Sequence, residues 1–339
     1  MRGCGGPDGW RYRLTASIGN DYVQYVRENV GHSSSMTQRV DAVLIAGPTA
    51  SGKSRLAMAL AEEIGGIVIN ADSMQVYREP RILTARPSDA DMVRVPHLLY
   101  GHISARELYS AGRYQGDATN ALQEARVLGR IPIFTGGTGM YFGVLTQGIA
   151  NIPPIAASVR DRMRARLEEI GVAALHAELA TRDPETASQL RASDPQRVLR
   201  ACEVFEATGR PLAQWQKEMG KPVLEGSGVA KFVLDIPRPD LRTRIETRFR
   251  AMIEEGAVEE AATLEGIDPA LPAAKILGLR EIWALRRGEI SEADAIVSAV
   301  TATRQFAKRQ TTWFRNRMAD WDRLDRIDVN EIARRLDEP

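Results

Sequence analysis

Short apolar runs alternate with helically spaced apolar positions over the first third of the chain. Residues 41–46, 67–69 and 131–135 form β-prone runs of the length expected for strands buried on both faces. Between them, apolar side chains recur every three or four residues over 54–64 and 117–128, which predicts helices. Glycines follow both helical patterns, as is common at helix C-termini. This alternation predicts an α/β fold, a parallel sheet core flanked by helices.

The composition changes after Pro153-Pro154, where Ala, Arg, Glu and Leu dominate and no strand pattern interrupts the helical spacing. We predict an all-helical insertion over residues 151–220, with helices over 158–170, 172–180, 184–191 and 195–208. A strand pattern at 231–236 then restores the α/β core, which we assign to residues 39–150 and 221–339. Further helices are predicted over 240–255, 257–264, 279–287 and 291–314.

Two stretches lack regular patterning. Residues 1–38 are rich in Gly, Ser, Asn and Arg, and we expect a disordered extension, or sequence upstream of a start at Met36. The segment between Tyr77 and Tyr109 contains three prolines, and we predict that it forms a long loop over the ligand-binding site of the fold. Long irregular loops in compact domains are usually functional or mobile.

A glycine-rich loop follows the first predicted strand and precedes the first predicted helix. It fits G-x-x-x-x-G-K-[ST] at every fixed position and reads Gly47, Pro48, Thr49, Ala50, Ser51, Gly52, Lys53 and Ser54. Its backbone amides and the helix N-terminus favour an anion. Lys53 is expected to pair with a diphosphate or triphosphate, and Ser54 to ligate Mg²⁺. The alternative is a turn that binds nothing.

The strand at 131–135 ends in Thr135-Gly136-Gly137-Thr138, where a nucleotide hydrolase would carry a metal-binding Asp. This favours a transferase that moves a group to or from a diphosphate. Asp72 follows the second strand, at the sheet edge where such folds bind ligands, and is a candidate general base. The alternative is that Asp72 caps a turn. Ser73, Gln75 and Tyr77 beside it suit a nucleobase.

Composition restricts the compartment more than the function. The chain has 45 Lys and Arg against 44 Asp and Glu, so an RNA surface would have to come from clustering. Cys4 and Cys202 are too few and too distant in sequence for a metal site or a disulfide framework, which favours a reduced, cytoplasmic compartment. No apolar run reaches the length of a membrane span, and the N-terminus lacks the apolar core of a signal peptide.

Basic residues gather in three places, each either an RNA-binding surface or a solvated face paired with nearby Glu. The clusters are Arg160, Arg162, Arg164 and Arg166; Arg197 and Arg200; and Arg304, Lys308 and Arg309, followed by Arg315 and Arg317. Arg244 and Arg248 share one helix face, and one of them could reach a leaving diphosphate. Trp313 is expected in the core, the alternative being a base-stacking platform. His97 and His102 lack metal-ligand spacing.

From about residue 40 to residue 315 the chain resembles the bacterial tRNA isopentenyltransferase, or tRNA dimethylallyltransferase, family. The matching motifs, in the family's order, are residues 47–54, Asp72-Ser73-Met74-Gln75-Val76-Tyr77, Gly136-Gly137-Thr138-Gly139-Met140-Tyr141, Asp194-Pro195-Gln196-Arg197 with Arg200-Ala201, Arg244 to Phe249, and Thr303-Arg304-Gln305 through Ala307-Lys308-Arg309-Gln310. The resemblance implies a P-loop NTPase-like core. It also implies transfer of a dimethylallyl group from its diphosphate to the exocyclic amine of the adenosine just 3′ of the tRNA anticodon.

The resemblance also implies roles for individual residues. Asp72 would deprotonate the amine, Thr138 would lie near the reaction centre, and Arg248 would bind diphosphate. Residues 47–54 would then hold a prenyl diphosphate rather than ATP, and residues 151–220 would grip the anticodon stem-loop. The implied tRNA contacts are Asp72, Ser73, Met74, Gln75, Thr138, Arg160, Gln196, Arg197, Val198, Leu199, Arg200, Lys275, Gly278 and Arg280. We expect a monomer.

Two departures from the family pattern stand out. Residues 78–86 differ from the family's glycine-containing text, and Leu279 stands where an aromatic residue is common. Two other functions fit the P-loop. One is a small-molecule kinase in which Asp72 activates a hydroxyl, and the other is a nucleotide-gated RNA-binding protein without catalysis.

Overall fold

The computed structural model describes residues 12–15, 24–27, 40–226 and 228–337. Near the N-terminus, β1 (Tyr12–Thr15) and β2 (Gln24–Arg27) pair antiparallel. The rest of the extension predicted over 1–38 lies outside the described residues. The chain divides into two compact units, one formed by residues 1–142 and 224–339 and the other by 143–223.

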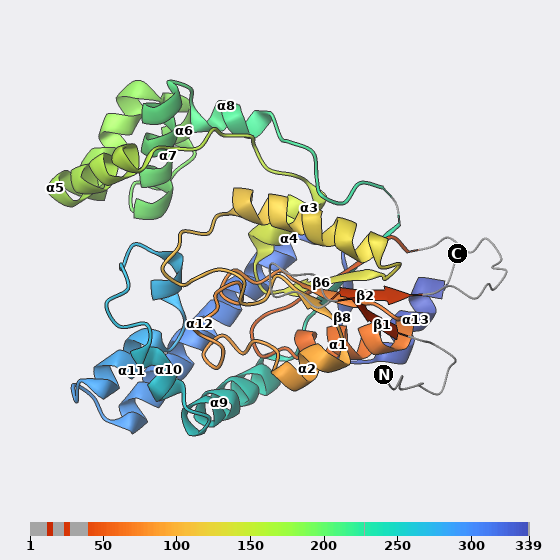
Figure 1. Ribbon diagram of the computed structural model, residues 1–339. Coiled ribbons are helices and arrows are strands. Elements are labelled where there is room, and N and C mark those ends of the chain that lie inside the picture. The colour runs from red at the N-terminus through yellow and green to blue at the C-terminus, as the bar shows by residue number, and fades with distance from the viewer. Residues whose placement is uncertain (1–11, 16–23, 28–39, 227, 338–339) are drawn as a thin grey trace. The chain divides into compact units, whose positions relative to one another are not determined.

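The larger unit is built on a parallel six-stranded sheet (Figure 1). The strand order is β5-β4-β6-β3-β7-β8, and all neighbouring strands run parallel. The strands are β3 (Ala42–Ala46), β4 (Ile67–Asn70), β5 (His97–Leu98), β6 (Pro132–Gly136), β7 (Val229–Leu234) and β8 (Asp322–Leu324). The parallel α/β core predicted from the apolar runs is confirmed.

Helices cover both faces of this sheet, as Figure 1 shows. One face packs against α1 (Lys53–Ile64) and α13 (Val329–Asp337), with Val43, Ile45 and Phe232 among its buried side chains. Across β4 and β6, the other face carries α3 (Ala111–Val127). Because successive strand residues point to opposite faces, β3 needs apolar residues at every position, and it has them.

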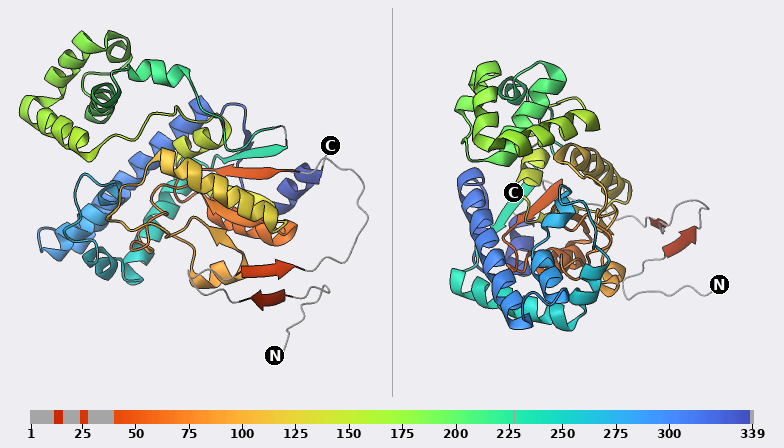
Figure 2. Two further views of the ribbon diagram at one scale, coloured as in Figure 1. Left: turned by 45° about the horizontal axis from the view of Figure 1, so that its top comes forward. Right: turned by 90° about the vertical axis from the view of Figure 1, so that its left-hand side faces the viewer.

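The C-terminal helices form a second layer of packing in the larger unit. They are α9 (Arg238–Glu254), α10 (Ala257–Ala262), the 3₁₀ turn η1 (Pro272–Lys275), α11 (Leu279–Arg286) and α12 (Glu292–Arg317). The long helix α12 packs against both α9 and α11 (Figure 2). These packed helices place residues from far along the sequence beside the loops of the sheet.

The smaller unit is helical and has a core of its own. It contains α5 (Ala157–Arg182), α6 (Pro184–Ser188), α7 (Pro195–Thr208) and α8 (Leu212–Lys217), which enclose side chains such as Leu175, Leu179 and Val204. The predicted break between helices near residue 171 is a kink, because Gly171 has φ 77° inside α5. The predicted insertion, residues 151–220, falls within this unit.

The irregular stretch between Tyr77 and Tyr109 contains two short elements, α2 (Asp89–Arg94) and β5. Helix α3 starts six residues before the predicted position 117, at Ala111. The sequence patterns also missed α4 (Gly139–Thr146), α8, β8 and α13. Among the described residues, no helix combines the length and apolar character needed to cross a membrane.

Candidate active site

The phosphate loop joins β3 to α1 in the way its motif predicts. Gly52 precedes α1 with φ 92°, a conformation that favours glycine. A Cβ on Gly47 would lie 2.8 Å from Ser51 Oγ, so the loop closes tightly only without a side chain there. Lys53 Nζ lies 3.4 Å from the carbonyl oxygen of Pro48, which folds the lysine back over the loop. The backbone is therefore shaped to cradle an anion.

Three cations reach this loop. Arg244 Nη1 donates to the carbonyl oxygen of Ser51 at 3.0 Å, and the other two are Lys53 and Arg248. Burial lowers the pKa of Lys53 to about 8, while the nearby Asp72 carboxylate raises it and Arg248 lowers it further. Burial also lowers the pKa of Arg248, and Asp72 opposes that shift. Lys53, Arg248 and Asp72 thus lie close enough to influence one another. Lys53 and Arg248 lose solvation here, and a bound polyanion would compensate for that loss.

Arg248 and Gln310 tie the phosphate loop to the C-terminal helices. Arg248 Nη2, from α9, donates to Thr49 Oγ1 at 2.5 Å. The backbone amide of Thr49 donates to Gln310 Oε1 at 2.8 Å, and Gln310 Nε2 donates to the carbonyl oxygen of Gly137 at 2.8 Å. The amide group of Gln310, a buried residue of α12, therefore bridges the phosphate loop and the turn after β6.

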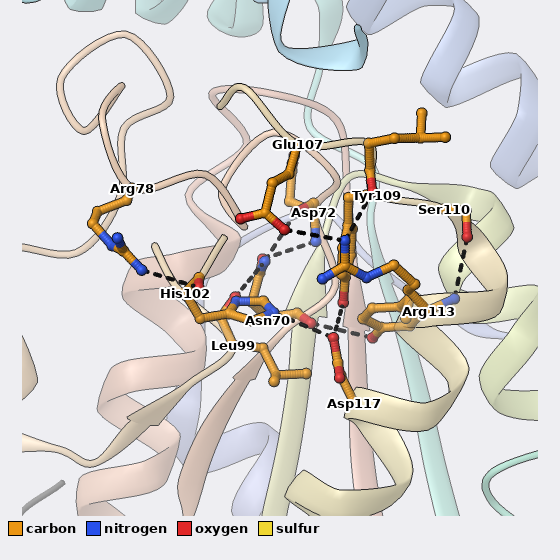
Figure 3. Close-up of polar contacts among 12 residues, drawn as sticks. Asn70, Asp72, Arg78, Leu99, His102, Glu107, Tyr109, Ser110, Arg113 and Asp117 are labelled. Carbon is orange, nitrogen blue, oxygen red and sulfur yellow. Dashed lines mark hydrogen bonds and ion pairs between the residues drawn. The ribbon is translucent and has the colours of Figure 1, made fainter. Parts of the chain in front are cut away.

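Asp72 lies directly after β4 and is held by its neighbour Asn70 (Figure 3). Asn70 Oδ1 accepts a hydrogen bond from the Asp72 amide at 2.8 Å, and Asn70 Nδ2 donates to the Asp72 carbonyl oxygen at 2.9 Å. Asp72 Oδ1 accepts from the amide of Met74 at 3.0 Å. A Cβ on Gly137 would lie 3.1 Å from Asp72 Oδ2, so the carboxylate faces the turn after β6.

Thr138 connects the same turn to the residue after Asp72. Its Oγ1 accepts from the Ser73 amide at 2.9 Å and lies 3.1 Å from Ser73 Oγ, to which it can donate. The Thr138 hydroxyl therefore fixes the Asp72–Ser73 backbone against the end of β6. Asp72, Thr138, Lys53 and Arg248, which are widely separated in sequence, meet at the carboxyl edge of the sheet, as predicted.

A polar network that the sequence did not predict lies behind Asp72 (Figure 3). Tyr114 Oη donates to the carbonyl oxygen of Asn70 at 3.1 Å, and Tyr109 Oη donates to Asp117 Oδ2 at 2.6 Å. His102 Nε2 lies 3.4 Å from the same carboxylate oxygen, and burial lowers the pKa of His102. Tyr114 and Asp117 come from α3, and His102 and Tyr109 come from the loop before it. Of these four, only Asp117 lies within the helix predicted from the sequence.

Comparison with known proteins places this geometry in a family. A model described as IPP transferase matches residues 75–317. The chain is 52% identical over 286 residues to a tRNA dimethylallyltransferase of Azorhizobium caulinodans, covering 83% of this chain and 91% of the relative. It is 47% identical over 293 residues to the enzyme of that name from Sinorhizobium medicae, covering 86% and 96%. The chain belongs to the IPP transferase family.

Solved structures agree with this assignment to the IPP transferase family. The full-length tRNA isopentenylpyrophosphate transferase of Bacillus halodurans superposes with a TM-score of 0.60 at 32% identity, covering 88% of this chain and 97% of that one. A eukaryotic dimethylallyltransferase, described as acting on tRNA, gives 0.71 at 27% identity, covering 86% and 75%. The P-loop NTPase-like fold predicted for this IPP transferase is confirmed.

The predicted tRNA contacts of this IPP transferase fall in both units. Arg160 lies on α5, and residues 196–200 lie on α7. In α7 the Gln196, Arg197 and Arg200 side chains are exposed, whereas Val198 is fully buried in the core of the smaller unit. Val198 therefore packs the helix against the core and presents no surface for a tRNA contact. The role of these residues in tRNA binding stays a prediction.

The remaining predicted contacts of the IPP transferase lie in the larger unit. Lys275 and Arg280 are exposed on either side of Gly278, which begins α11 with φ 84°. A Cβ on Gly278 would lie 2.5 Å from Phe249 Cε2, so any side chain at this position would collide with the Phe249 ring. The buried Gln75 uses its amide on the loop, donating to the carbonyl oxygens of Thr84 and Ala85 at 2.8 and 2.9 Å. Its side chain thus supports the loop at residues 78–86.

The basic clusters of this IPP transferase differ in how they are paired. On α5, Arg162 pairs with Glu206, Arg164 with Asp161, and Arg166 with Glu169 and Glu178. The pairs Arg197–Asp194 and Arg200–Glu203 each have their closest charged atoms 3.5 Å apart. On α12, Arg304 pairs with Glu246, but within the described residues no ion pair reaches Lys308, Arg309, Arg315 or Arg317. Pairing with nearby carboxylates therefore accounts for Arg162, Arg164 and Arg166 of α5, whereas the exposed cations at the end of α12 have no such partner among the described residues.

Proposed function

We propose that this chain transfers a dimethylallyl group from dimethylallyl diphosphate to the exocyclic amine of the adenosine 3′-adjacent to the anticodon in tRNA, releasing diphosphate. The observation that carries the proposal is the meeting of a carboxylate, Asp72, with the Lys53 and Arg248 cations at a phosphate loop. The names of its close relatives support the same activity. No carboxylate follows β6, where a hydrolase would carry one.

Different residues would act on the leaving diphosphate and on the attacking amine. Lys53 and Arg248 would stabilise negative charge that develops on the leaving diphosphate. The bond from the first prenyl carbon to the diphosphate oxygen breaks, and a bond from that carbon to the amine nitrogen forms. The proton lost by the amine passes to Asp72, which acts as the general base. Thr138 holds the backbone beside Asp72 in place.

We include Mg²⁺ in the proposal, with Ser54 as its protein ligand. Ser54 is partly exposed in the first turn of α1, directly after Lys53. Mg²⁺ commonly uses one or two protein oxygens together with substrate phosphates and waters, so a hydroxyl beside a phosphate cradle fits the ion. When bound, the ion would offset charge on the diphosphate oxygens.

We also propose that the macromolecular partner is tRNA, bound through its anticodon stem-loop. The target base must leave its stack to reach a pocket at the sheet edge, and a helical unit that grips the anticodon stem-loop would permit this. Arg160, Gln196, Arg197 and Arg200 would supply the contacts from the smaller unit. We further infer a cytoplasmic enzyme, because its tRNA substrate is there, and a monomer.

The deciding assay mixes purified protein, Mg²⁺, dimethylallyl diphosphate and unmodified tRNA whose anticodon is followed by adenosine. Mass spectrometry of the digested tRNA should show prenyl-adenosine. The variant Asp72→Ala should cut turnover about 10²- to 10⁴-fold while changing tRNA affinity far less. Phosphate transfer from ATP to a metabolite, with no prenyl-adenosine, would instead establish the kinase. RNA binding without either product would establish the binding protein.

A further inference from the structure

The outer face of α12 carries a hollow next to the candidate active site. Its volume is about 540 Å³, and it is lined by polar and basic side chains around one indole ring: Gln305, Lys308, Arg309, Trp313, Asn316 and Arg317. We call this feature the α12 hollow. All of these side chains are exposed except that of Trp313, which is half-buried. The hollow lies wholly within the larger unit.

The cations of the α12 hollow have no protein counter-charge. Among the residues that the structure describes, no carboxylate lies within ion-pair distance of Lys308, Arg309 or Arg317. Exposed arginines elsewhere in the larger unit do find partners, such as Arg94 with Glu62 at 2.7 Å and Arg287 with Glu289 at 2.6 Å. The three cations lie on about three turns of one exposed helix face and give it a local positive charge. A polyanion is the ligand that such a surface would attract.

Trp313 joins the hollow to the site. A Cβ on Gly139 would lie 2.2 Å from Trp313 Cε3, so the indole packs directly on the backbone that follows Thr138. The neighbouring Met140 is 61% exposed. One turn earlier on α12, Gln310 bonds to Gly137 and Thr49. The hollow thus begins about 5 Å, one helical turn, from a residue that touches the phosphate loop.

We propose that the α12 hollow binds the single-stranded RNA backbone immediately flanking the target adenosine, with phosphates on Lys308, Arg309 and Arg317 and a base or ribose against Trp313. This inference rests on the proposed function. It gives a specific role to the end of α12, where Gln305, Lys308 and Arg309 belong to the family-like motif at residues 303–310 and Trp313, Asn316 and Arg317 follow it. Cationic grooves with an aromatic surface are the usual way to hold single-stranded nucleic acid. The short path to Thr138 makes the flanking nucleotides, rather than the distant stem, the part of the RNA that fits.

A charge-neutralising variant tests the phosphate contacts. The triple variant Lys308→Gln, Arg309→Gln, Arg317→Gln should bind an anticodon stem-loop about tenfold more weakly near 0.1 M salt. The slope of log affinity against log salt should shrink by about 0.7 for each lost contact. The control removes the same charge from paired arginines, with Arg94→Gln, Arg287→Gln and Arg335→Gln. An unchanged slope in the first variant, or an equal loss in the control, would overturn the proposal.

Crosslinking tests the position. A stem-loop carrying 4-thiouridine on either side of the target adenosine should, on irradiation, label the tryptic peptide 310–315, which contains Trp313. Crosslinks confined to other peptides would contradict the proposal. If the triple variant loses affinity for inorganic triphosphate and keeps it for RNA, the hollow is a small-anion site instead. None of these measurements requires prenyl transfer, so they separate failure of this inference from failure of the proposed function.

Discussion

At the scale of single residues, the position of Asp72 depends on the side chain of Asn70. The Asn70 amide is fully buried, and each of its groups is used. Its oxygen accepts from the Asp72 amide, and its nitrogen donates to the carbonyl oxygens of Asp72 and Leu99, the latter at 3.0 Å. The Asn70 side chain thus hydrogen-bonds to both the amide and the carbonyl oxygen of Asp72. A general base needs such fixed geometry, because small displacements reduce proton transfer.

The variant Asn70→Asp tests whether these hydrogen bonds position Asp72, and it changes the side-chain volume very little. The carboxylate keeps an acceptor for the Asp72 amide but faces two carbonyl oxygens without a donor, at a cost of about 1–3 kcal/mol. We expect turnover to fall at least about tenfold while KM for dimethylallyl diphosphate changes less than about twofold, because Lys53 and Arg248 are untouched. Steady-state kinetics measure both. The exposed Asn120→Asp is the control, and equal effects in the two variants would contradict the interpretation.

The pKa of Lys53 predicts how donor binding depends on pH. With a pKa of about 8 in the free protein, Lys53 loses its proton as the pH rises through 8, and the neutral amine attracts an anion less. The diphosphate ester is already fully ionised there, since its last pKa is near 6. Affinity for dimethylallyl diphosphate should therefore be highest near pH 7, between the two pKa values, and fall by up to about tenfold per unit above pH 8.

Calorimetric titration between pH 6.5 and 9.5 measures this dependence. The variant Lys53→Met should bind more weakly, and its affinity should not change with pH in this range because no group with a pKa near 8 remains at the loop. A flat profile for the unaltered protein would mean that Lys53 keeps its proton throughout. Parallel profiles for both proteins would mean that another group titrates.

The sequence predicted the residues of the site that belong to local motifs. Lys53 and Asp72 were predicted because a phosphate loop and a strand end are each encoded within a few residues. The roles of Asn70, Gln310 and Tyr114 were not predicted, because they depend on contacts between distant parts of the chain. Gln310, for example, reaches Thr49 across 261 positions, and no spacing pattern encodes such a contact.

At the scale of elements, the divergent loop at residues 78–86 is held in place by one carboxylate. Glu260, on α10, accepts hydrogen bonds from three successive backbone amides of the loop, those of Arg81, Ile82 and Leu83, at 2.6, 2.7 and 2.8 Å. The end of the loop accepts two hydrogen bonds from Gln75. Glu260 thus orders a loop that connects directly to the segment carrying Asp72.

The variant Glu260→Ala should loosen this loop. Three backbone amides would lose their acceptor, and those of Ile82 and Leu83 are partly buried. We expect this loss to lower the free energy of unfolding by about 2 kcal/mol and to free the loop locally. Limited trypsin digestion should cut after Arg78 or Arg81 several-fold faster than in the parent. Glu260→Gln keeps one carbonyl oxygen, so its digestion rate should fall between those of the parent and of Glu260→Ala. The exposed neighbour Glu259→Ala is the control, and matching digestion rates for the two alanine variants would refute this role.

Periodicity predicted elements only where one face of an element is buried. Helix α1 has such a face and was predicted to within one residue. Helix α4 buries most of its surface, so its apolar residues show no helical period and it was missed. Strand β8 has three residues and buries only Leu324, so pairing with β7 defines it rather than its own sequence. Buried strands such as β3 still show as apolar runs, but a buried helix such as α4 and a three-residue strand such as β8 can be assigned only from the tertiary structure.

At the scale of the whole molecule, the candidate active site lies in the larger unit, and the smaller unit is a helical unit with its own core. The phosphate loop, Asp72, Thr138, Arg248 and Gln310 all belong to the larger unit. The smaller unit has its own core, and its two ends are adjacent in space. The Gly220 amide donates to the carbonyl oxygen of Ile149 at 3.0 Å, and Ala150 and Met219 form an antiparallel bridge. The chain therefore leaves and re-enters this unit at nearly one point.

This arrangement predicts that the functions can be separated by deletion. Replacing residues 150–219 with a short Gly-Ser linker joins ends that already touch, so the larger unit should still fold. Affinity for dimethylallyl diphosphate should stay within about threefold, because the groups that bind it remain. Stem-loop affinity should fall at least about a hundredfold, since Arg160, Arg197 and Arg200 are lost along with the rest of their unit. Thermal denaturation with and without the diphosphate, and filter binding of the stem-loop, measure the two effects. Stem-loop binding that survives the deletion would place tRNA recognition in the larger unit, with the α12 hollow as its first candidate.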